Sequence, residues 1–175
     1  MDREQAKAEW VRAALHEYEG ALIRYAAQIT GDLERARDVV QDTFLKLCAE
    51  DPARLDGHLR EWLFTVCRNR ARDVVRKEHR MKPLEDARLE ITADGESSPA
   101  DQAAANENSR QMERLVAALP DNQREVVRLK FQSGLSYKEI SKVTDLSVSD
   151  VGFLIHTAMK TLRAEMQKEE GFSAS

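Results

Sequence analysis

The sequence predicts an all-α protein in which two small helical domains are joined by a flexible acidic linker. Only 7 of its 175 residues are glycine and 4 are proline, and runs of β-branched residues are few, so helices are favoured over strands. Two helix starts led by serine lie near the C-terminus. Residues 83–108 hold seven acidic residues and few large apolar ones, which predicts a linker between domains at 1–82 and 109–170.

Three helices are expected in the first domain, at residues 9–29, 33–49 and 59–80. Apolar residues recur in each at the spacing of a buried helical face. The segment Thr30-Gly31-Asp32 ends the first helix, because glycine adopts the left-handed conformation common at helix ends. The expected core residues are Trp10, Ala14, Leu15, Tyr18, Leu22, Tyr25 and Ile29 in the first helix, Ala36, Val39, Val40, Leu45 and Leu47 in the second, and Trp62, Leu63, Val66, Val74 and Val75 in the third.

The faces opposite these apolar stripes are polar. The second helix is expected to expose Asp38, Gln41, Asp42 and Lys46, and the third a basic face of Arg68, Asn69, Arg72, Arg76 and Lys77. Such a basic face can bind the phosphates of a nucleic-acid strand, or it can be an ordinary solvated surface. From this helix alone both interpretations remain open. The short polar loop at 52–58, which contains Gly57, is suited to presenting side chains to a ligand.

The serine-led starts predict a helix-turn-helix. Ser136 and Glu139 have capping-box spacing, and Ser147 with Asp150 is an acidic variant of it. A short helix and a tight turn at Thr144-Asp145 separate the two starts. The second helix of such a motif can enter the major groove of DNA. An ordinary helical hairpin is the alternative, and we favour DNA binding because a matching helix precedes the motif.

The net charge of −4 is unevenly distributed along the chain. Residues 51–82 have a net charge of +4 and residues 111–163 of +2, whereas residues 83–110 have −5. Two separate basic blocks are expected if two surfaces meet phosphate. Because the excess is small, we expect that a larger partner brings the chain to DNA.

Several functional classes are not favoured. Cys48 and Cys67 form no CxxC pair and have no histidine at ligand spacing, so free thiols are expected. The four histidines are scattered, and no catalytic constellation or glycine-rich phosphate loop is visible, which argues against an enzyme, a metal or a cofactor. No apolar run could span a bilayer and the N-terminus does not have the pattern of a signal peptide. We therefore expect a cytoplasmic protein without membrane insertion.

Four segments occur in a fixed order along the chain. They are Asp38-Val39-Val40-Gln41-Asp42-Thr43-Phe44, then Trp62-Leu63-Phe64 with Arg68-Asn69 and Asp73, then Leu119-Pro120 with Arg124-Glu125-Val126, and finally Gly134-Leu135-Ser136-Tyr137-Lys138-Glu139-Ile140. Together they resemble the group IV (extracytoplasmic-function) sigma factors of bacterial RNA polymerase. The likeness covers about residues 10–82 and 110–166, with a linker where the family has one. Single segments are weak signals, whereas the ordered set is specific.

The resemblance implies an alternative sigma factor that binds core RNA polymerase and directs promoter-specific initiation. Docking on the clamp helices of the largest subunit would involve Asp38, Gln41, Asp42, Thr43 and Phe44, with Phe44 in the core or at the interface edge. Recognition and melting of the minus-ten element would involve His58, Arg60, Arg68, Asn69, Arg72 and Arg76, with Asn69 near a captured base. The linker would pass through the polymerase toward the RNA exit channel.

The resemblance also assigns the helix-turn-helix to the minus-thirty-five element and to the flap of the second-largest subunit. The DNA contacts would come from Ser136, Tyr137, Ser149, Gly152, Phe153, His156 and Lys160. The family's recognition helix usually begins with a Gly-Thr-Val-like turn followed by basic residues, whereas this one has little charge before Lys160. Phe153 is suited to a thymine methyl group and His156 to a phosphate or a guanine edge, but Phe153 and Leu154 are equally suited to a protein partner. The family further implies an anti-sigma factor.

Two other classes explain less of the sequence. A stand-alone helix-turn-helix regulator of transcription would leave residues 38–44 and the helix at 59–80 without a role. A hydrolytic or metal enzyme would need a cluster of catalytic side chains that the sequence does not contain.

Overall fold

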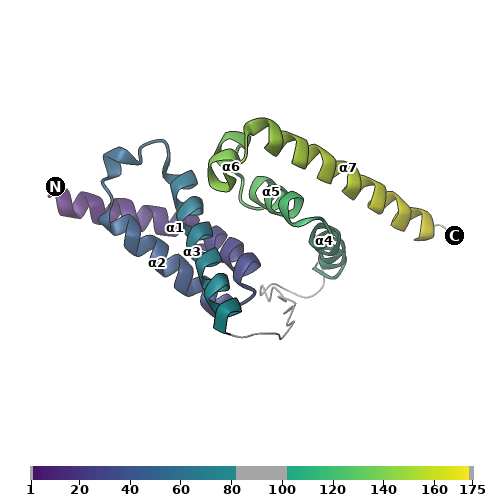
Figure 1. Cartoon of the computed structure of the whole chain (residues 1–175), viewed down its shortest axis with the longest axis horizontal. Helices are drawn as coiled ribbons and strands as arrows, with labels where there is room; N and C mark the ends of the chain where they lie inside the picture. Colours follow the sequence, from purple (N-terminus) through teal and green to yellow (C-terminus); the bar gives the residue numbers. More distant parts are fainter. Residues whose placement is uncertain (1, 82–101, 174–175) are drawn as a thin grey trace. The chain divides into compact units, whose positions relative to one another are not determined.

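The computed structural model describes residues 2–81 and 102–173. Within these residues it contains seven α-helices, a short 3₁₀ helix and no β-strand, which confirms the all-α prediction (Figure 1). The elements are α1 (Arg3–Thr30), α2 (Leu33–Ala49), η1 (Pro52–Arg54), α3 (Leu59–Met81), α4 (Gln102–Ala117), α5 (Asp121–Phe131), α6 (Tyr137–Thr144) and α7 (Val148–Ser173). They form two compact units, one built on α1, α2 and α3 and the other on α4, α5, α7 and the first half of α6.

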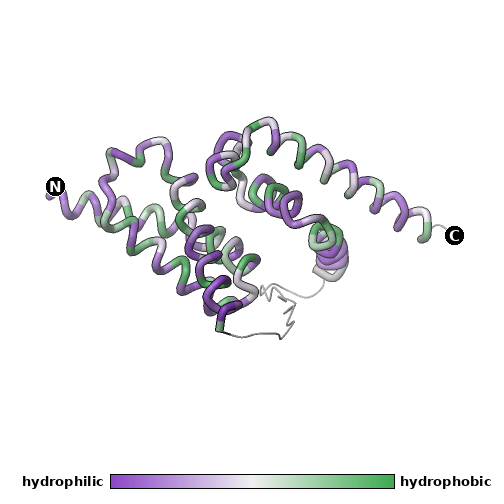
Figure 2. Tube along the Cα trace, in the orientation of Figure 1, coloured by the Kyte–Doolittle hydropathy of each residue, from purple (hydrophilic) through white to green (hydrophobic). Residues whose placement is uncertain are grey.

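In the first unit, α1, α2 and α3 each pack against the other two. Hydrophobic and hydrophilic segments alternate along each helix, as expected for amphipathic helices around a shared core (Figure 2). Leu22, Leu63 and Phe64 are fully buried, and the rings of Tyr25 and Phe64 lie 5.5 Å apart in a tilted arrangement. Tilted aromatic pairs of this kind add to the stability that burial provides.

Local sequence signals set the helix ends. Gly31 has a φ of 75° and closes α1 by donating its N–H to the Ala27 carbonyl. The Asp32 carboxylate then accepts a hydrogen bond from the Glu34 N–H at 3.1 Å and caps α2. The predicted stop after the first helix and the predicted bounds of the second are confirmed. The first helix begins earlier than expected, at Arg3.

Several predicted core positions are wrong. Leu15 and Leu45 are 37% and 62% exposed. In α3 the fully buried residues include Phe64, Cys67 and Ala71, whereas Trp62, Val66, Val74 and Val75 are only half-buried. The reason is geometric: apolar residues on a helix span a wider arc than the neighbouring helices can cover, so the packing decides which of them are enclosed.

In the second unit, α5 and α4 both pack against α7. A buried cluster joins the three helices and consists of Val116, Leu119, Val127, Ala158 and Leu162. Helix α4 begins at Gln102, so it extends into the C-terminal end of the segment predicted as a linker at 83–108. Three consecutive alanines at 103–105 explain this extension, since alanine has the highest helix propensity. The rest of that prediction lies outside the described residues.

The two cysteines are free and have different surroundings. Cys48 is exposed and Cys67 is buried. Burial raises the pKa of the Cys67 thiol from 9.0 to about 12, although a hydrogen bond with Thr43 opposes the shift. The reactive thiolate is therefore scarce at Cys67 at neutral pH.

We expect the native protein to react with one equivalent of a thiol reagent at pH 8, at Cys48, because Cys67 is both buried and protonated. Denaturant should expose the second thiol. Titration with a chromogenic disulfide measures both values. The variant Cys48→Ser serves as the control and should show no rapid reaction while folded; rapid native labelling of that variant would contradict the burial of Cys67.

Candidate nucleic-acid and partner interfaces

The exposed side of α2 forms the first candidate interface. Asp38, Gln41 and Leu45 follow one another at helical spacing and are exposed, and Asp42 lies half-buried beside them. We term these four residues the α2 surface. Single exposed leucines are common in proteins, but Leu45 lies among side chains that the sequence assigned to partner binding. It adds an apolar contact to a surface that is otherwise polar.

Thr43 and Phe44 do not belong to this surface, which corrects the sequence prediction. Thr43 is fully buried and its hydroxyl donates to the Val39 carbonyl at 2.9 Å. Phe44 is only 6% exposed, in agreement with the expectation that it could be a core residue. Both side chains pack in the core of the helical bundle, so they stabilise α2 and are not available to a partner.

An ion pair connects the α2 surface to α3. The Arg70 Nε donates to the Asp42 Oδ2 at 2.8 Å, and both side chains are partly exposed. Such pairs contribute only about 0–1 kcal/mol to the free energy of unfolding. The main effect of this pair is to orient the Asp42 carboxylate. Arg70 holds one carboxylate oxygen of Asp42 and thereby limits the directions in which the carboxylate can point.

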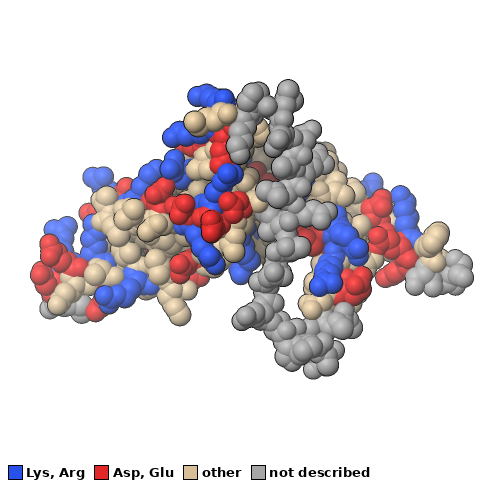
Figure 3. All heavy atoms as spheres, turned by 90° about the horizontal axis from the view of Figure 1, so that it is seen from below, with Lys and Arg blue, Asp and Glu red and all other residues tan. Residues whose placement is uncertain are grey.

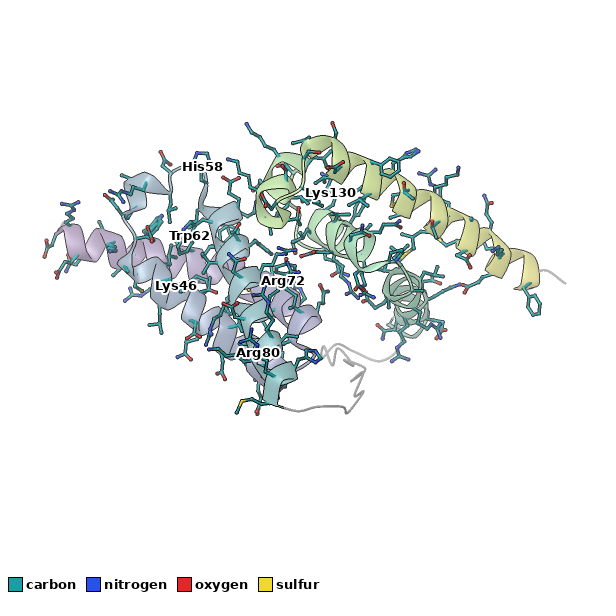
Figure 4. The ribbon with its side chains drawn as sticks, viewed as in Figure 1. Lys46, His58, Trp62, Arg72, Arg80 and Lys130 are labelled. Atoms are coloured by element: carbon teal, nitrogen blue, oxygen red, sulfur yellow. The ribbon has the colours of Figure 1, made fainter. Side chains whose placement is uncertain are left out.

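The second candidate interface is the basic face of α3. Asn69, Arg72, Arg76, Lys77 and Arg80 are exposed, and Arg68 is half-buried. Figure 4 shows Arg72 and Arg80 spaced along this helix, with Trp62 near its beginning. The fully buried side chains of α3 fix the rotation of the helix, so that its basic residues face outward.

The loop before α3 is more ordered than its polar sequence indicates. It contains η1, whose first turn is capped by the Asp51 carboxylate, and Leu55 is buried beneath it. His58 is 59% exposed and its Nδ1 lies 2.9 Å from Glu61 Oε1. Of the predicted minus-ten residues at this end, His58 is thus on the surface and Arg60 is half-buried.

The third candidate interface is the helix-turn-helix, and its predicted capping is confirmed. The Glu139 N–H donates to Ser136 Oγ at 3.1 Å, and the Glu139 carboxylate accepts from the Ser136 N–H at 3.0 Å. Ser147 Oγ accepts from the Asp150 N–H at 3.0 Å and starts α7. Asp145 between them has a φ of 60°, which is consistent with the predicted tight turn.

Helix α7 has two opposite faces with the same spacing. The buried stripe contains Val151, Ile155, Ala158 and Leu162. The exposed stripe contains Ser149, Phe153, His156 and Lys160. The two stripes are offset by two residues, or about 200° around the helix, so burial of the first directs the second outward. Four of the seven predicted minus-thirty-five residues therefore share one surface.

Tyr137 and Gly152 meet where α6 approaches α7. A side-chain carbon at Gly152 would lie 3.7 Å from the Tyr137 ring, an ordinary contact distance. Tyr137 is 39% exposed, and the Lys130 ammonium lies 5.3 Å from the centre of its ring. This cation–π contact places a positive charge over the face of a partly exposed aromatic group. Ser136 is exposed as well, although its hydroxyl serves as the helix cap.

Leu45 and Arg70 were not among the residues that the sequence pattern assigned to these surfaces. Leu45 lies seven residues after Asp38 and four after Gln41, so its helical phase already placed it on the polar side. Arg70 had no comparable signal, because its contact with Asp42 depends on how α2 and α3 pack.

Charge on the face that Figure 3 shows is mixed, with Lys and Arg interspersed among Asp and Glu.

Within residues 2–81 and 102–173, no group of three or more His, Cys, Asp or Glu side chains could hold a metal ion. Among these same residues, no helix is both long and apolar enough to cross a membrane.

Comparison with protein families assigns both units. Residues 14–81 match the model described as Sigma-70 region 2, and residues 109–162 match Sigma-70, region 4. The ECF RNA polymerase sigma factor SigL of Mycobacterium tuberculosis is 31% identical over 93% of this chain and 92% of that protein. The probable RNA polymerase sigma factor RfaY of Xanthomonas campestris is also 31% identical. The alignment covers 81% of this chain but only 36% of RfaY.

A solved structure agrees with the sequence comparison. The complex of CnrH with the cytosolic domain of CnrY contains a chain that is 26% identical, with a TM-score of 0.62 and 94% of each chain covered. Two helical units that match regions 2 and 4 in this order define a sigma-70-type transcription initiation factor. The chain belongs to the extracytoplasmic-function sigma factors, alternative sigma factors that direct promoter-specific initiation by RNA polymerase.

Proposed function

We propose that the α2 surface is the site at which this sigma factor docks on the clamp helices of the largest polymerase subunit. Asp38, Gln41 and Asp42 supply polar contacts and Leu45 an apolar one. Arg70 holds Asp42 in place from α3. Non-obligate interfaces are no more apolar than the rest of a protein surface, so a mainly polar docking site suits a factor that binds the polymerase and is released again.

The basic face of α3, with the loop before it, recognises and melts the minus-ten element in this proposal. Arg72 and Arg76 neutralise phosphates of the separated strands, and Asn69 lies near a captured base. Arg68, Arg60 and His58 extend the surface toward the start of the helix. A displaced strand needs cations along its backbone, and a flipped base needs a pocket to receive it.

The helix-turn-helix binds the minus-thirty-five element and lies against the flap of the second-largest subunit. The exposed stripe of α7 enters the major groove, and Ser136, Tyr137 and Gly152 lie beside it. We also propose an anti-sigma factor as a partner, because the similar solved structures include sigma factors held by such proteins, among them RpoE with NepR from Bartonella quintana. The site of action is the cytoplasm, where the polymerase works, and the factor itself needs no cofactor and catalyses no reaction.

A single observation supports this assignment most strongly. Each of the three polar surfaces lies opposite a buried stripe of the helix that presents it, and each falls within a segment matched by sigma-70 region 2 or region 4. The rival assignment, a stand-alone regulator, uses only the third of these surfaces.

Run-off transcription with reconstituted holoenzyme tests the function directly. We expect specific transcripts from promoters enriched out of a random library, and none from core polymerase alone. The free chain should bind the same duplexes weakly in a gel shift at moderate salt, because its +4 and +2 blocks are offset by acidic neighbours. Tight, sequence-specific binding by the free chain, without specific run-off, would favour the stand-alone regulator.

The change Leu45→Lys tests the docking surface. We expect the affinity for core polymerase to fall about tenfold or more, because the substitution removes an apolar contact and buries a charge at the interface. Thermal stability should stay within about 1 °C, since Leu45 is 62% exposed. Leu33→Lys is the matched control, as Leu33 is a 46% exposed leucine at the opposite end of α2. Equal affinities of the two variants would contradict the assignment.

The double change Arg72→Gln with Arg76→Gln tests the basic face. Open-complex formation should weaken and its salt dependence should become shallower, by about 1.5 in the slope of log K against log salt, because two phosphate contacts are lost. Asn69→Ala should alter base preference in the minus-ten element with little change in that slope. Arg12→Gln with Arg24→Gln on the exposed side of α1 is the control. If promoter melting is unchanged in the α3 variants, this face is an ordinary solvated surface with no role in DNA binding.

A further inference from the structure

Phe153 is a large apolar side chain on the surface that takes no part in the core of its unit. It is 69% exposed in the second turn of α7 and lies opposite the buried stripe of that helix. Removing its side chain would leave the core of the unit untouched. An aromatic residue of this size, directed away from the core by the helix that presents it, favours a role in binding.

The positions one turn from Phe153 along α7 carry no positive charge, and the exposed Asp150 among them carries a negative one. Along the exposed stripe, Ser149 and His156 are its neighbours one turn away on either side, and Lys160 contributes the first formal positive charge. Bidentate recognition of guanine by arginine is therefore not available on this part of the stripe. Selectivity here must come from shape and from apolar contact.

A second aromatic side chain lies near the residue before Phe153. Gly152 contributes no side chain, and a carbon added there would lie 3.7 Å from the Tyr137 ring. Tyr137 is itself partly exposed, and the Lys130 ammonium lies over its ring. This end of α7 therefore combines apolar groups with a nearby cation, which suits a methyl group in a groove bordered by phosphates.

We propose that Phe153 recognises the 5-methyl group of a thymine in the upstream promoter element. The proposal rests on the assignment of α7 to the major groove. Among the four standard bases only thymine presents a methyl group there, and phenylalanine is one of the side chains that contact it. Phe153 thus determines specificity at one or two T·A pairs by apolar contact, in place of the charged contacts that the exposed stripe lacks.

Uracil substitution tests the contact without changing base pairing. Promoters are first enriched from a library randomised in the upstream element, with holoenzyme containing the full-length chain. Each thymine of that element is then replaced by uracil in turn, on both strands. We expect replacement at one or two neighbouring positions to lower the apparent affinity of the holoenzyme three- to fivefold, the effect of removing about one buried methyl group.

The substitution Phe153→Ala should abolish this uracil effect, so that thymine and uracil promoters bind alike within about twofold. The matched control is Phe172→Ala, because Phe172 is an 87% exposed phenylalanine near the end of the same helix; it should keep the full effect. Phe153→Leu, which stays apolar, should retain part of it. Unfolding followed by circular dichroism should give the same midpoint for all four proteins.

The outcomes separate the inference from the proposed function. A uracil effect that persists in Phe153→Ala overturns the inference, as does indifference of the wild-type holoenzyme to every thymine methyl while specific run-off continues. Unchanged promoter preference of the Phe153→Ala holoenzyme would also overturn it and assign the side chain to a protein partner. Failure to obtain specific run-off from any enriched promoter would instead overturn the proposed function.

Discussion

The three helices of the first unit meet at a small buried polar contact on which both of its surfaces depend. Cys67 of α3 is within hydrogen-bonding distance of Thr43 of α2, and its Sγ donates weakly to the Leu22 carbonyl of α1 at 3.9 Å. Thr43 is satisfied by the Val39 carbonyl, so no buried polar atom of this group is left without a partner. Thr43 and Cys67 lie on the buried sides of α2 and α3, so this contact, together with the apolar side chains around it, helps to set the rotation of both helices. A shift in either helix would move the residues that we propose for docking and for DNA binding together.

In the second unit, hydrogen bonds between residues close in sequence help to set how the helices present their exposed side chains. Serine caps define where α6 and α7 begin, and a left-handed residue, Asp145, sets the turn between them. Once α7 starts at Val148, its periodicity determines which side chains face the core and which face outward. The Ser147 cap sets where the helix begins, and burial of Val151, Ile155, Ala158 and Leu162 sets its rotation, so that Phe153 faces outward. The proposed recognition surface therefore depends on the cap and on the core together.

Sequence predicted the parts of this arrangement that are local. Helix ends at Gly31, Ser136 and Ser147 follow from capping, which involves residues at most three or four positions apart. Burial was predicted less well, because Phe44 and Leu45 are neighbours of similar hydrophobicity and only the packing of α2 decides which is enclosed. The ion pair of Arg70 with Asp42 spans 28 residues and left no trace in either local pattern. The family motifs supplied candidate interface positions, and the structure shows that Thr43 and Phe44 are buried whereas Leu45 is exposed, which changes the docking surface that we propose.

Many charges of this chain are already paired within it, and this limits what each surface can bind alone. Ion pairs join Asp42 with Arg70, Glu78 with Arg35, Glu113 with Arg128 and Asp121 with Arg124. The excess of positive charge is local and small, +4 over residues 51–82 and +2 over residues 111–163, so we expect either unit by itself to bind DNA weakly. When a polymerase holds both units, binding of one unit to DNA makes binding of the other intramolecular. The resulting high effective concentration of the second unit would then compensate for the weak affinity of each unit alone. A factor with a net charge of −4 that bound DNA only when held in this way would leave most of the genome's non-specific sites unoccupied.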